Sequence, residues 1–187
     1  MKLRADIAVE KREFAKAESL LKKAIEVDQE SPILHYNYAV LLSQFLNKIE
    51  DAKAHYLKVI EYFPGFIDAH LNYALLCQDN FNEAEKHYLY IIENYPNLSE
   101  PAHVHYAILL EKHFKSKLLI EKHYNKALEL NPLSINAYTN YADFLQKDIA
   151  TINKAFELFE KALEIDSNHE FTLKKYITVL LTFHGYY

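Results

Sequence analysis

Apolar and polar residues follow one another along this chain in the order typical of amphipathic helices, and the same pattern returns about every 34 residues. Tyr38, Tyr73, Tyr106, Tyr141 and Tyr176 recur at intervals of 33 to 35 residues, and the first four are each followed by alanine. A fixed aromatic residue and a fixed small residue at this period are typical of a helical solenoid. The sequence therefore predicts a series of stacked helix pairs.

A second helix in each predicted repeat is marked by three apolar columns. Offsets of four and three residues place the three columns on one helix face. The columns are Ala17, Ala52, Ala84, Ile120 and Ala155; Leu21, Tyr56, Tyr88, Tyr124 and Phe159; and Ala24, Val59, Ile91, Ala127 and Ala162. Pro64, Pro96 and Pro132 close three repeats, because proline cannot continue the preceding helix. We expect one array over 1–187, with repeats 1–31, 32–66, 67–99, 100–134 and 135–169 and a terminal helix over 170–185.

Composition narrows the class of protein further. Two glycines and five prolines in 187 residues favour long helices with short connections. The formal net charge of −5 is spread along the chain, so no basic cluster indicates nucleic-acid binding. The longest apolar runs, of about five residues, are too short to cross a membrane, and no secretory signal is recognisable. With Cys77 as its single cysteine, we expect the protein in the cytoplasm or nucleus.

The columns alternate small and large residues, which lets two helix backbones approach closely while the aromatic rings fill the groove between them. This pattern, together with the four Tyr-Ala pairs and the closing prolines, resembles the tetratricopeptide repeat (TPR) family over essentially the whole chain. Alanine replaces the family's usual glycine, and the family's tryptophan position holds His35, His70, His103 and Tyr138. The resemblance implies an all-α fold, a right-handed α-solenoid of antiparallel helix pairs with about five repeats plus a C-terminal helix. It also implies a non-catalytic scaffold whose concave groove binds an extended or helical segment of a partner protein.

The resemblance also suggests which residues contact that partner. In the family, the residue before the recurring tyrosine points into the groove, and a row of asparagines there resembles the ladder of the O-linked N-acetylglucosamine transferases. Asparagine amides can bind a peptide backbone without reading its sequence. The alternative is that they only solvate the groove or cap a neighbouring helix. The predicted contact residues are Asn37, Asn72 and Asn140 for the backbone, and Tyr36, His70, His105, Tyr138 and Lys175 for selectivity. The pattern needed to clamp the C-terminal carboxylate of a chaperone is not matched.

No motif predicts catalysis, a cofactor or a metal site. His55, His87 and His123 form a column, but equivalent positions on stacked repeats lie about 10 Å apart, the scale of helix packing. Ligands of one zinc ion lie about 2 Å from it, so this column cannot chelate. We interpret the three histidines as partly buried polar residues in a helix seam, and we expect the chain not to be an enzyme.

Two other functions stay open. The chain could be a structural segment of a larger assembly or of a longer TPR protein, contacting its neighbours or a second copy through the convex face and the open C-terminal helix. The residues expected at that interface are Tyr176, Leu180, Phe183 and Tyr187. A weaker resemblance, to the half-TPR proteins of RNA processing, would connect the chain to RNA only through a protein partner, since its acidic charge does not favour direct contact.

Overall fold

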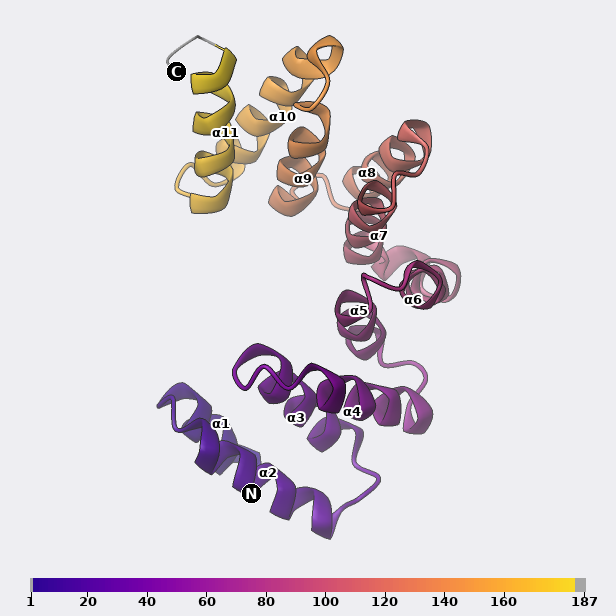
Figure 1. Ribbon diagram of the computed structural model, residues 1–187, viewed down its shortest axis with the longest axis vertical. Helices are drawn as coiled ribbons and strands as arrows, with labels where there is room; N and C mark the ends of the chain where they lie inside the picture. The colour runs from indigo at the N-terminus through magenta and orange to yellow at the C-terminus, as the bar shows by residue number, and fades with distance from the viewer. Residues whose placement is uncertain (1, 184–187) are drawn as a thin grey trace. The chain divides into compact units, whose positions relative to one another are not determined.

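The computed structural model describes residues 2–183, and side chains from residue 5 onward; all the regular elements in this range are helices (Figure 1). Their bounds are α1 Lys2–Glu10, α2 Phe14–Val27, α3 Pro32–Gln44, α4 Ile49–Tyr62, α5 Ile67–Leu76, α6 Phe81–Asn94, η1 Pro96–Leu98, α7 Glu100–Lys112, α8 Lys117–Leu130, α9 Ile135–Leu145, η2 Ile149–Thr151, α10 Ile152–Ile165 and α11 Glu170–Phe183. The predicted all-α solenoid is confirmed. The repeat limits given above stay a prediction.

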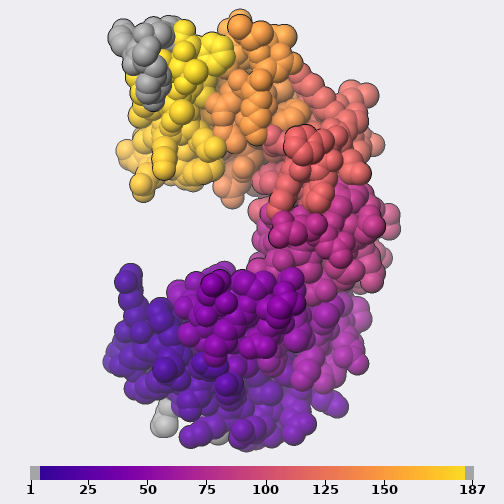
Figure 2. Space-filling view, in the orientation of Figure 1, coloured from indigo at the N-terminus to yellow at the C-terminus, as the bar shows by residue number. Residues whose placement is uncertain are grey.

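The chain divides into two compact units, residues 1–87 and 88–187, and the division falls inside α6. In the N-terminal unit, α1 packs on α2 and α3 packs on α4, and the pairs are joined by contacts of α2 with α3 and of α4 with α5. The space-filling view shows α1 to α4 as one continuous surface (Figure 2). In the C-terminal unit, α7 packs on α8 and α9 on α10, and α10 also contacts α11.

The core of each unit consists of the residues that the repeat pattern singled out. In the first helices, Ala39, Ala74, Ala107 and Ala142 are fully buried, and the tyrosine before each of them is at most 7% exposed. All fifteen residues of the three second-helix columns are buried as well. Close backbone approach at the alanines and filling by the rings therefore hold each helix pair together.

Local sequence sets where the helices begin and where the chain turns. Pro32 stands in the first turn of α3, where its missing N–H has no intrahelical partner to lose. Ser134 caps α9, since its hydroxyl accepts a hydrogen bond from the Ala137 amide at 3.1 Å. Arg12, Asn47 and Phe114 turn the chain between paired helices with φ of 57°, 51° and 52°. Left-handed backbone is costly for arginine and phenylalanine, and here it allows the amides of Glu13 and Lys115 to donate to the carbonyl oxygens of Ala8 and Leu110, which closes the helix ends.

None of the helices within residues 2–183 combines the length and the apolar character needed to cross a membrane.

Candidate functional site

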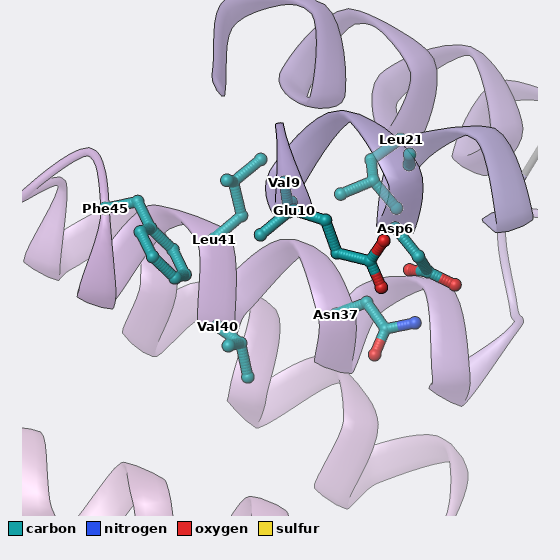
Figure 3. A pocket seen from close by; sticks show the side chains of 9 residues that line it. Asp6, Val9, Glu10, Leu21, Asn37, Val40, Leu41 and Phe45 are labelled. Carbon is teal, nitrogen blue, oxygen red and sulfur yellow. The ribbon is translucent and has the colours of Figure 1, made fainter. Parts of the chain in front are cut away.

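The predicted contact residue Asn37 lies at a cavity between α1 and α3 in the N-terminal unit (Figure 3). The cavity has a volume of about 280 Å³. It is lined by Ala5, Asp6, Val9, Glu10, Leu21, Asn37, Val40, Leu41 and Phe45. The Nδ2 atom of Asn37 is buried and has no hydrogen-bond partner. A buried amide nitrogen without an acceptor costs free energy, so this position favours a ligand that supplies one.

The charge of this cavity is negative. Asp6 and Glu10 stand one turn apart on α1, and Figure 3 shows both carboxylates on the side of the cavity where the Asn37 amide lies. Neither carboxylate forms an ion pair with another side chain that the structure describes. Val9, Val40 and Phe45 supply apolar walls beside them. The cavity can therefore receive a group that is apolar along its length and carries a cation or a hydrogen-bond acceptor.

Asn72 is engaged within the protein. Its Nδ2 donates to the phenolic oxygen of Tyr36 at 3.0 Å, which connects α5 to α3. The Tyr36 ring stacks on Phe66 with centroids 4.9 Å apart and meets Tyr56 edge-on at 5.8 Å. Burial raises the pKa of Tyr36. Tyr36 and Asn72 therefore hold each other in place on half-exposed surface. One N–H of the Asn72 amide and its carbonyl oxygen remain available for a ligand.

His70 lies in the seam between α5 and α6 and not on the exposed side of α5. Its ring is 4% exposed. Its Nε2 lies 3.0 Å from the carbonyl oxygen of Pro64 and its Nδ1 lies 2.8 Å from Nδ1 of His87. Both ring nitrogens are thus occupied by the fold, and we leave His70 out of the set of residues proposed below to contact a partner.

The remaining predicted contact residues lie in the C-terminal unit. The Nδ1 of His105 on α7 is buried without a hydrogen-bond partner, and burial lowers the pKa of this ring. Asn140 uses its Nδ2 on the carbonyl oxygen of Asn136, one turn earlier in its own helix, at 2.8 Å. Lys175 pairs with Asp143 at 2.8 Å and lies over the Phe171 ring at 5.6 Å. Tyr138 is half-buried on α9. The three asparagines of the predicted row, Asn37, Asn72 and Asn140, therefore lie in three different environments.

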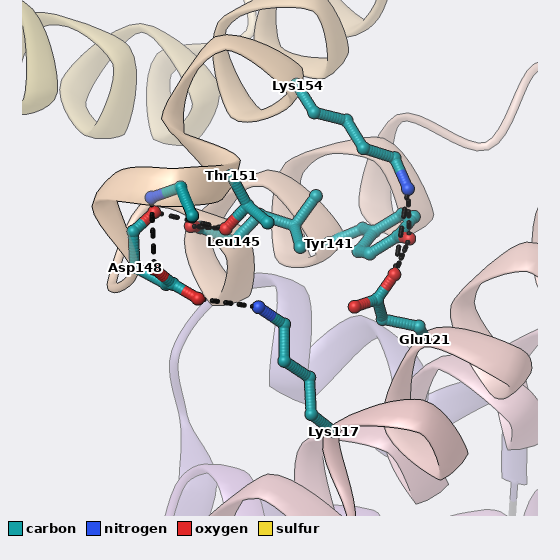
Figure 4. Close-up of polar contacts among 8 residues, drawn as sticks. Lys117, Glu121, Tyr141, Leu145, Asp148, Thr151 and Lys154 are labelled. Carbon is teal, nitrogen blue, oxygen red and sulfur yellow. Dashed lines mark hydrogen bonds and ion pairs between the residues drawn. The ribbon is translucent and has the colours of Figure 1, made fainter.

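A second surface of the C-terminal unit, where the turns α7–α8 and α9–α10 meet, carries many charges that neutralise one another. Lys117 pairs with Asp148 at 2.7 Å, and the Tyr141 hydroxyl lies between Glu121 and Lys154 (Figure 4). Phe114 beside them is 96% exposed and lines a cavity of about 380 Å³. Because these charged side chains already have partners of opposite charge, they would attract a charged ligand less strongly than the carboxylates at the cavity of Asn37.

The predicted interface residues of α11 have different surroundings. Tyr176 packs edge-on against Phe156 and donates its hydroxyl to Glu160 at 2.9 Å, so it holds α11 to α10. Leu180 is half-buried and Phe183 is 42% exposed. Tyr187 lies outside the described residues. Phe171 and Ile177, which the prediction did not include, are 48% and 50% exposed on the same helix.

The described residues support neither a metal site nor a reactive thiol. Among the residues that the structure describes, no group of three or more His, Cys, Asp or Glu side chains is placed to hold a metal ion. Cys77 is 6% exposed and burial raises the pKa of its thiol, which makes it a small core residue.

The comparisons with known proteins agree with this architecture. Residues 135–169 match the sequence model of the tetratricopeptide repeat family. MamA (residues 41 to the end) from Desulfovibrio magneticus RS-1 has a similar structure, with a TM-score of 0.72 and 15% identity over 90% of this chain and 94% of its own. PilF of Pseudomonas aeruginosa gives a TM-score of 0.73 and 18% identity over 100% of this chain and 90% of its own. YrrB, described as a TPR protein with an unusual peptide-binding site, gives 0.63 and 18% over 92% of this chain and 88% of its own.

No curated protein sequence matches the chain at a significant level. At 15 to 18% identity the structural likenesses establish the fold, and the family model identifies one helix pair by sequence. Residues 135–169 are therefore a tetratricopeptide repeat by sequence, and the chain as a whole has the fold of tetratricopeptide repeat proteins.

Sequence reasoning missed two sets of residues. Asp6 and Glu10, four residues apart on α1, could have been found from their helical spacing, but nothing in the sequence indicated that α1 packs beside Asn37. The second set is three contacts between paired histidine rings inside the repeats, which are taken up below. The seam position of His55, His87 and His123 was predicted, but their partners were not.

Proposed function

We propose that this protein is a non-catalytic interaction scaffold whose first helices bind a segment of a partner protein. The observation that carries the proposal is the buried, unpaired Nδ2 of Asn37 at the cavity between α1 and α3. Peptide binding by the structurally similar YrrB supports the same class of function. Asn72 with Tyr36, and His105, Tyr138, Asn140 and Lys175 in the other unit, are further proposed contacts along the first helices.

The chemistry of the cavity suggests the kind of residue that it takes. A peptide carbonyl would accept a hydrogen bond from Asn37 Nδ2, and a lysine or arginine side chain would lay its aliphatic part along Val9 and Val40. Its charged end would then meet the carboxylates of Asp6 and Glu10. We therefore propose a peptide segment with at least one basic residue, bound without a cofactor and in the cytoplasm or nucleus.

The test is a binding screen with two peptide libraries of equal length and apolar content, one basic and one acidic. Affinities of the selected peptides are then measured by fluorescence anisotropy for the wild type and for Asn37→Ala. We expect selection from the basic library and a loss of about fivefold to tenfold in affinity on Asn37→Ala, which corresponds to one hydrogen bond of about 1 kcal/mol. Asn125→Ala, on the exposed side of α8, is the matched control and should leave affinity unchanged.

A second pair of variants separates the charge from the amide. Asp6→Asn with Glu10→Gln keeps the shape of the cavity and should abolish the preference for basic peptides while preserving the unfolding midpoint. Equal selection from both libraries, with no effect of the charge change, would show that the cavity is not the binding site. The proposal of a peptide-binding scaffold itself fails if neither library yields a peptide whose labelled form is displaced from the protein by the same unlabelled peptide at micromolar concentration.

Self-assembly is a second candidate function, favoured by the exposed apolar residues Phe171, Ile177 and Phe183 on α11. Sedimentation equilibrium over a concentration series should then give a mass above 22.0 kDa. Ile177→Lys with Phe183→Lys should return the mass to that of the monomer. A monomer in the wild type at all concentrations would remove this candidate and leave the peptide-binding proposal as it is.

A further inference from the structure

Three helix pairs are joined by a direct contact between two histidine rings. The Nδ1 atoms of His35 and His55 lie 2.7 Å apart, those of His70 and His87 lie 2.8 Å apart, and those of His103 and His123 lie 2.8 Å apart. In each case the first residue lies on the first helix of a repeat and the second on its partner helix. A tyrosine ring one turn after the first histidine lies 4.7 Å from the second ring in all three repeats; these are Tyr38, Tyr73 and Tyr106.

Such a contact constrains where the hydrogens lie. Two nitrogens at hydrogen-bond distance attract each other only when one carries a hydrogen and the other presents its lone pair. His35 Nε2 lies 2.8 Å from the carbonyl oxygen of Gln29, and His70 Nε2 lies 3.0 Å from that of Pro64. A carbonyl can only accept, so both rings carry their hydrogen on Nε2 and accept through Nδ1. Their partners, His55 and His87, are then the Nδ1 donors.

Protonation of both rings of a pair would abolish this arrangement. One added proton can be accommodated, because the neutral ring still presents a lone pair at Nδ1, but with both rings charged each would point an N–H at the other and the attraction would become a repulsion. The first-helix rings have little access to water that could relieve this repulsion. His35 is fully buried, and the other first-helix histidines are 4% and 6% exposed.

The three histidine pairs differ in the charged side chains that lie near them. The first pair faces Asp51, Lys58 and Lys22, and the third faces Lys122, Lys126 and Glu129. In the second pair, the Nε2 of His87 lies 3.5 Å from the Glu83 carboxylate, with Lys86 nearby, and the Tyr73 hydroxyl also donates to Glu83 at 3.2 Å. A proton on His87 Nε2 would be neutralised by Glu83 and would keep the Nδ1 hydrogen bond. Burial lowers the pKa of His70 to about 4, as in the other pairs, so the second pair differs from them in having Glu83 to neutralise its first added proton.

We propose that the paired histidines make these repeats acid-labile, so that mildly acidic solution separates the first helix from the second helix in the repeats of His35–His55 and His103–His123. The inference is independent of what the scaffold binds.

The direction of the effect follows from linkage. Burial lowers the pKa of His55, His103 and His123 to about 4, below the ordinary histidine value of about 6.5. The opened state then binds more protons than the closed state between these values. The contribution of these histidines to the free energy of unfolding is constant above about pH 6.5 and falls as the pH falls toward 4.

The fifth repeat provides a control within the same chain. Tyr138 and Leu158 occupy the positions that the other repeats fill with the paired histidines, three residues before the recurring tyrosine and one before the second-helix aromatic. The helices α9 and α10 therefore contain no ring pair that acid could open.

The experiment is hydrogen exchange of the full chain at pH 7.5 and pH 4.5, corrected for the intrinsic rate and resolved by helix. Protection of α3–α4 and α7–α8 should fall by about tenfold or more, since the pH lies two units below the ordinary histidine pKa. Protection of α9–α10 should change much less. Equal loss in α9–α10 would overturn the inference, because general acid unfolding would then explain the result.

A double variant tests the pair itself. His103→Tyr with His123→Leu copies the fifth repeat into the fourth, and the acid-induced loss of protection in α7–α8 should disappear while α3–α4 keeps its own. A persistent loss in α7–α8 would contradict the proposal. Nitrogen-15 NMR of the wild type needs no variant: His35 and His70 should show hydrogen on Nε2, and His55 and His87 on Nδ1. The same tautomer in both rings of a pair would exclude the hydrogen bond.

Discussion

The hydroxyl of Tyr141 donates to the carboxylate of Glu121 at 3.0 Å and links α9 to the second helix of the preceding repeat. The same kind of link joins Tyr38 to Glu18 at 3.2 Å and Tyr176 to Glu160 at 2.9 Å. The recurring tyrosine therefore has two roles. Its ring fills the core of its own repeat, and the hydroxyls of Tyr38, Tyr141 and Tyr176 contact the repeat before them, whereas that of Tyr73 donates to Glu83 of its own repeat.

Removing the hydroxyl should weaken the contact between repeats. The Tyr141 oxygen also accepts from Lys154 at 2.6 Å, so Tyr141→Phe removes two polar contacts but leaves the ring in place. We expect the free energy of unfolding, measured by urea denaturation, to fall by about 1 to 2 kcal/mol. Tyr138→Phe on the same helix is the control and should change it by less than about 0.5 kcal/mol. Equal effects of the two variants would show that the hydroxyl link contributes nothing.

Enlarging the small residue beside this tyrosine should be costly for a different reason. Ala142 is fully buried where two helices approach closely, so Ala142→Leu would force the helices apart. We expect a loss of about 1 to 3 kcal/mol in the free energy of unfolding. Ala54→Leu, on the exposed side of α4, should be close to neutral. A neutral Ala142→Leu would mean that the seam has free space that the structure does not show.

Glu18 should contribute stability that is lost in strong acid. Hydrogen bonds from Lys48 first, then from Lys22 and Tyr38, lower the pKa of its carboxyl to about 2. Because the folded pKa lies below the ordinary value of 4.5, this contribution is complete above about pH 4.5 and disappears as the pH falls toward 2. The difference in unfolding midpoint between the wild type and Glu18→Gln should shrink over that interval.

The matched variant for this titration is Glu26→Gln, an exposed residue of the same helix. Its difference from the wild type should stay small throughout. The window for Glu18 and that of the histidine pairs overlap only between about pH 4 and 4.5, so the two acid effects can be separated by pH above and below it. A Glu18→Gln difference that vanished between pH 6.5 and 5 would contradict the assignment to this carboxyl.

The ion pair of Lys117 and Asp148 should contribute little in spite of its short distance. The two side chains are 45% and 49% exposed, so water and salt screen their attraction. We expect Lys117→Ala to lower the free energy of unfolding by less than about 1 kcal/mol, with the effect fading at about 1 M salt. Asp148 is a poor choice for this test, because its carboxylate also accepts from the Ala150 amide at 3.0 Å. A loss above 2 kcal/mol that persists in salt would show that the pair is coupled to the fold of the turn.

Much of the core could be predicted from the order of residues. The Tyr-Ala pairs and the three second-helix columns are buried as expected, because helical spacing alone determines which side chains share a face. The candidate site was harder. Asn37, Asn72 and Asn140 stand at equivalent positions, yet one amide nitrogen is unpaired, one binds Tyr36 and one binds its own helix.

By itself, then, the sequence determined the helix pairs, their order and the residues that hold each pair together, since these depend only on the periodicity of residues along the chain. The tertiary structure decided the polar partners. His35 contacts His55 twenty residues away because α4 packs against α3, and Asp6 lies at the cavity of Asn37 because α1 and α3 line the same cavity. A hydrogen bond depends on the distance and direction between atoms of different helices, and periodicity fixes neither.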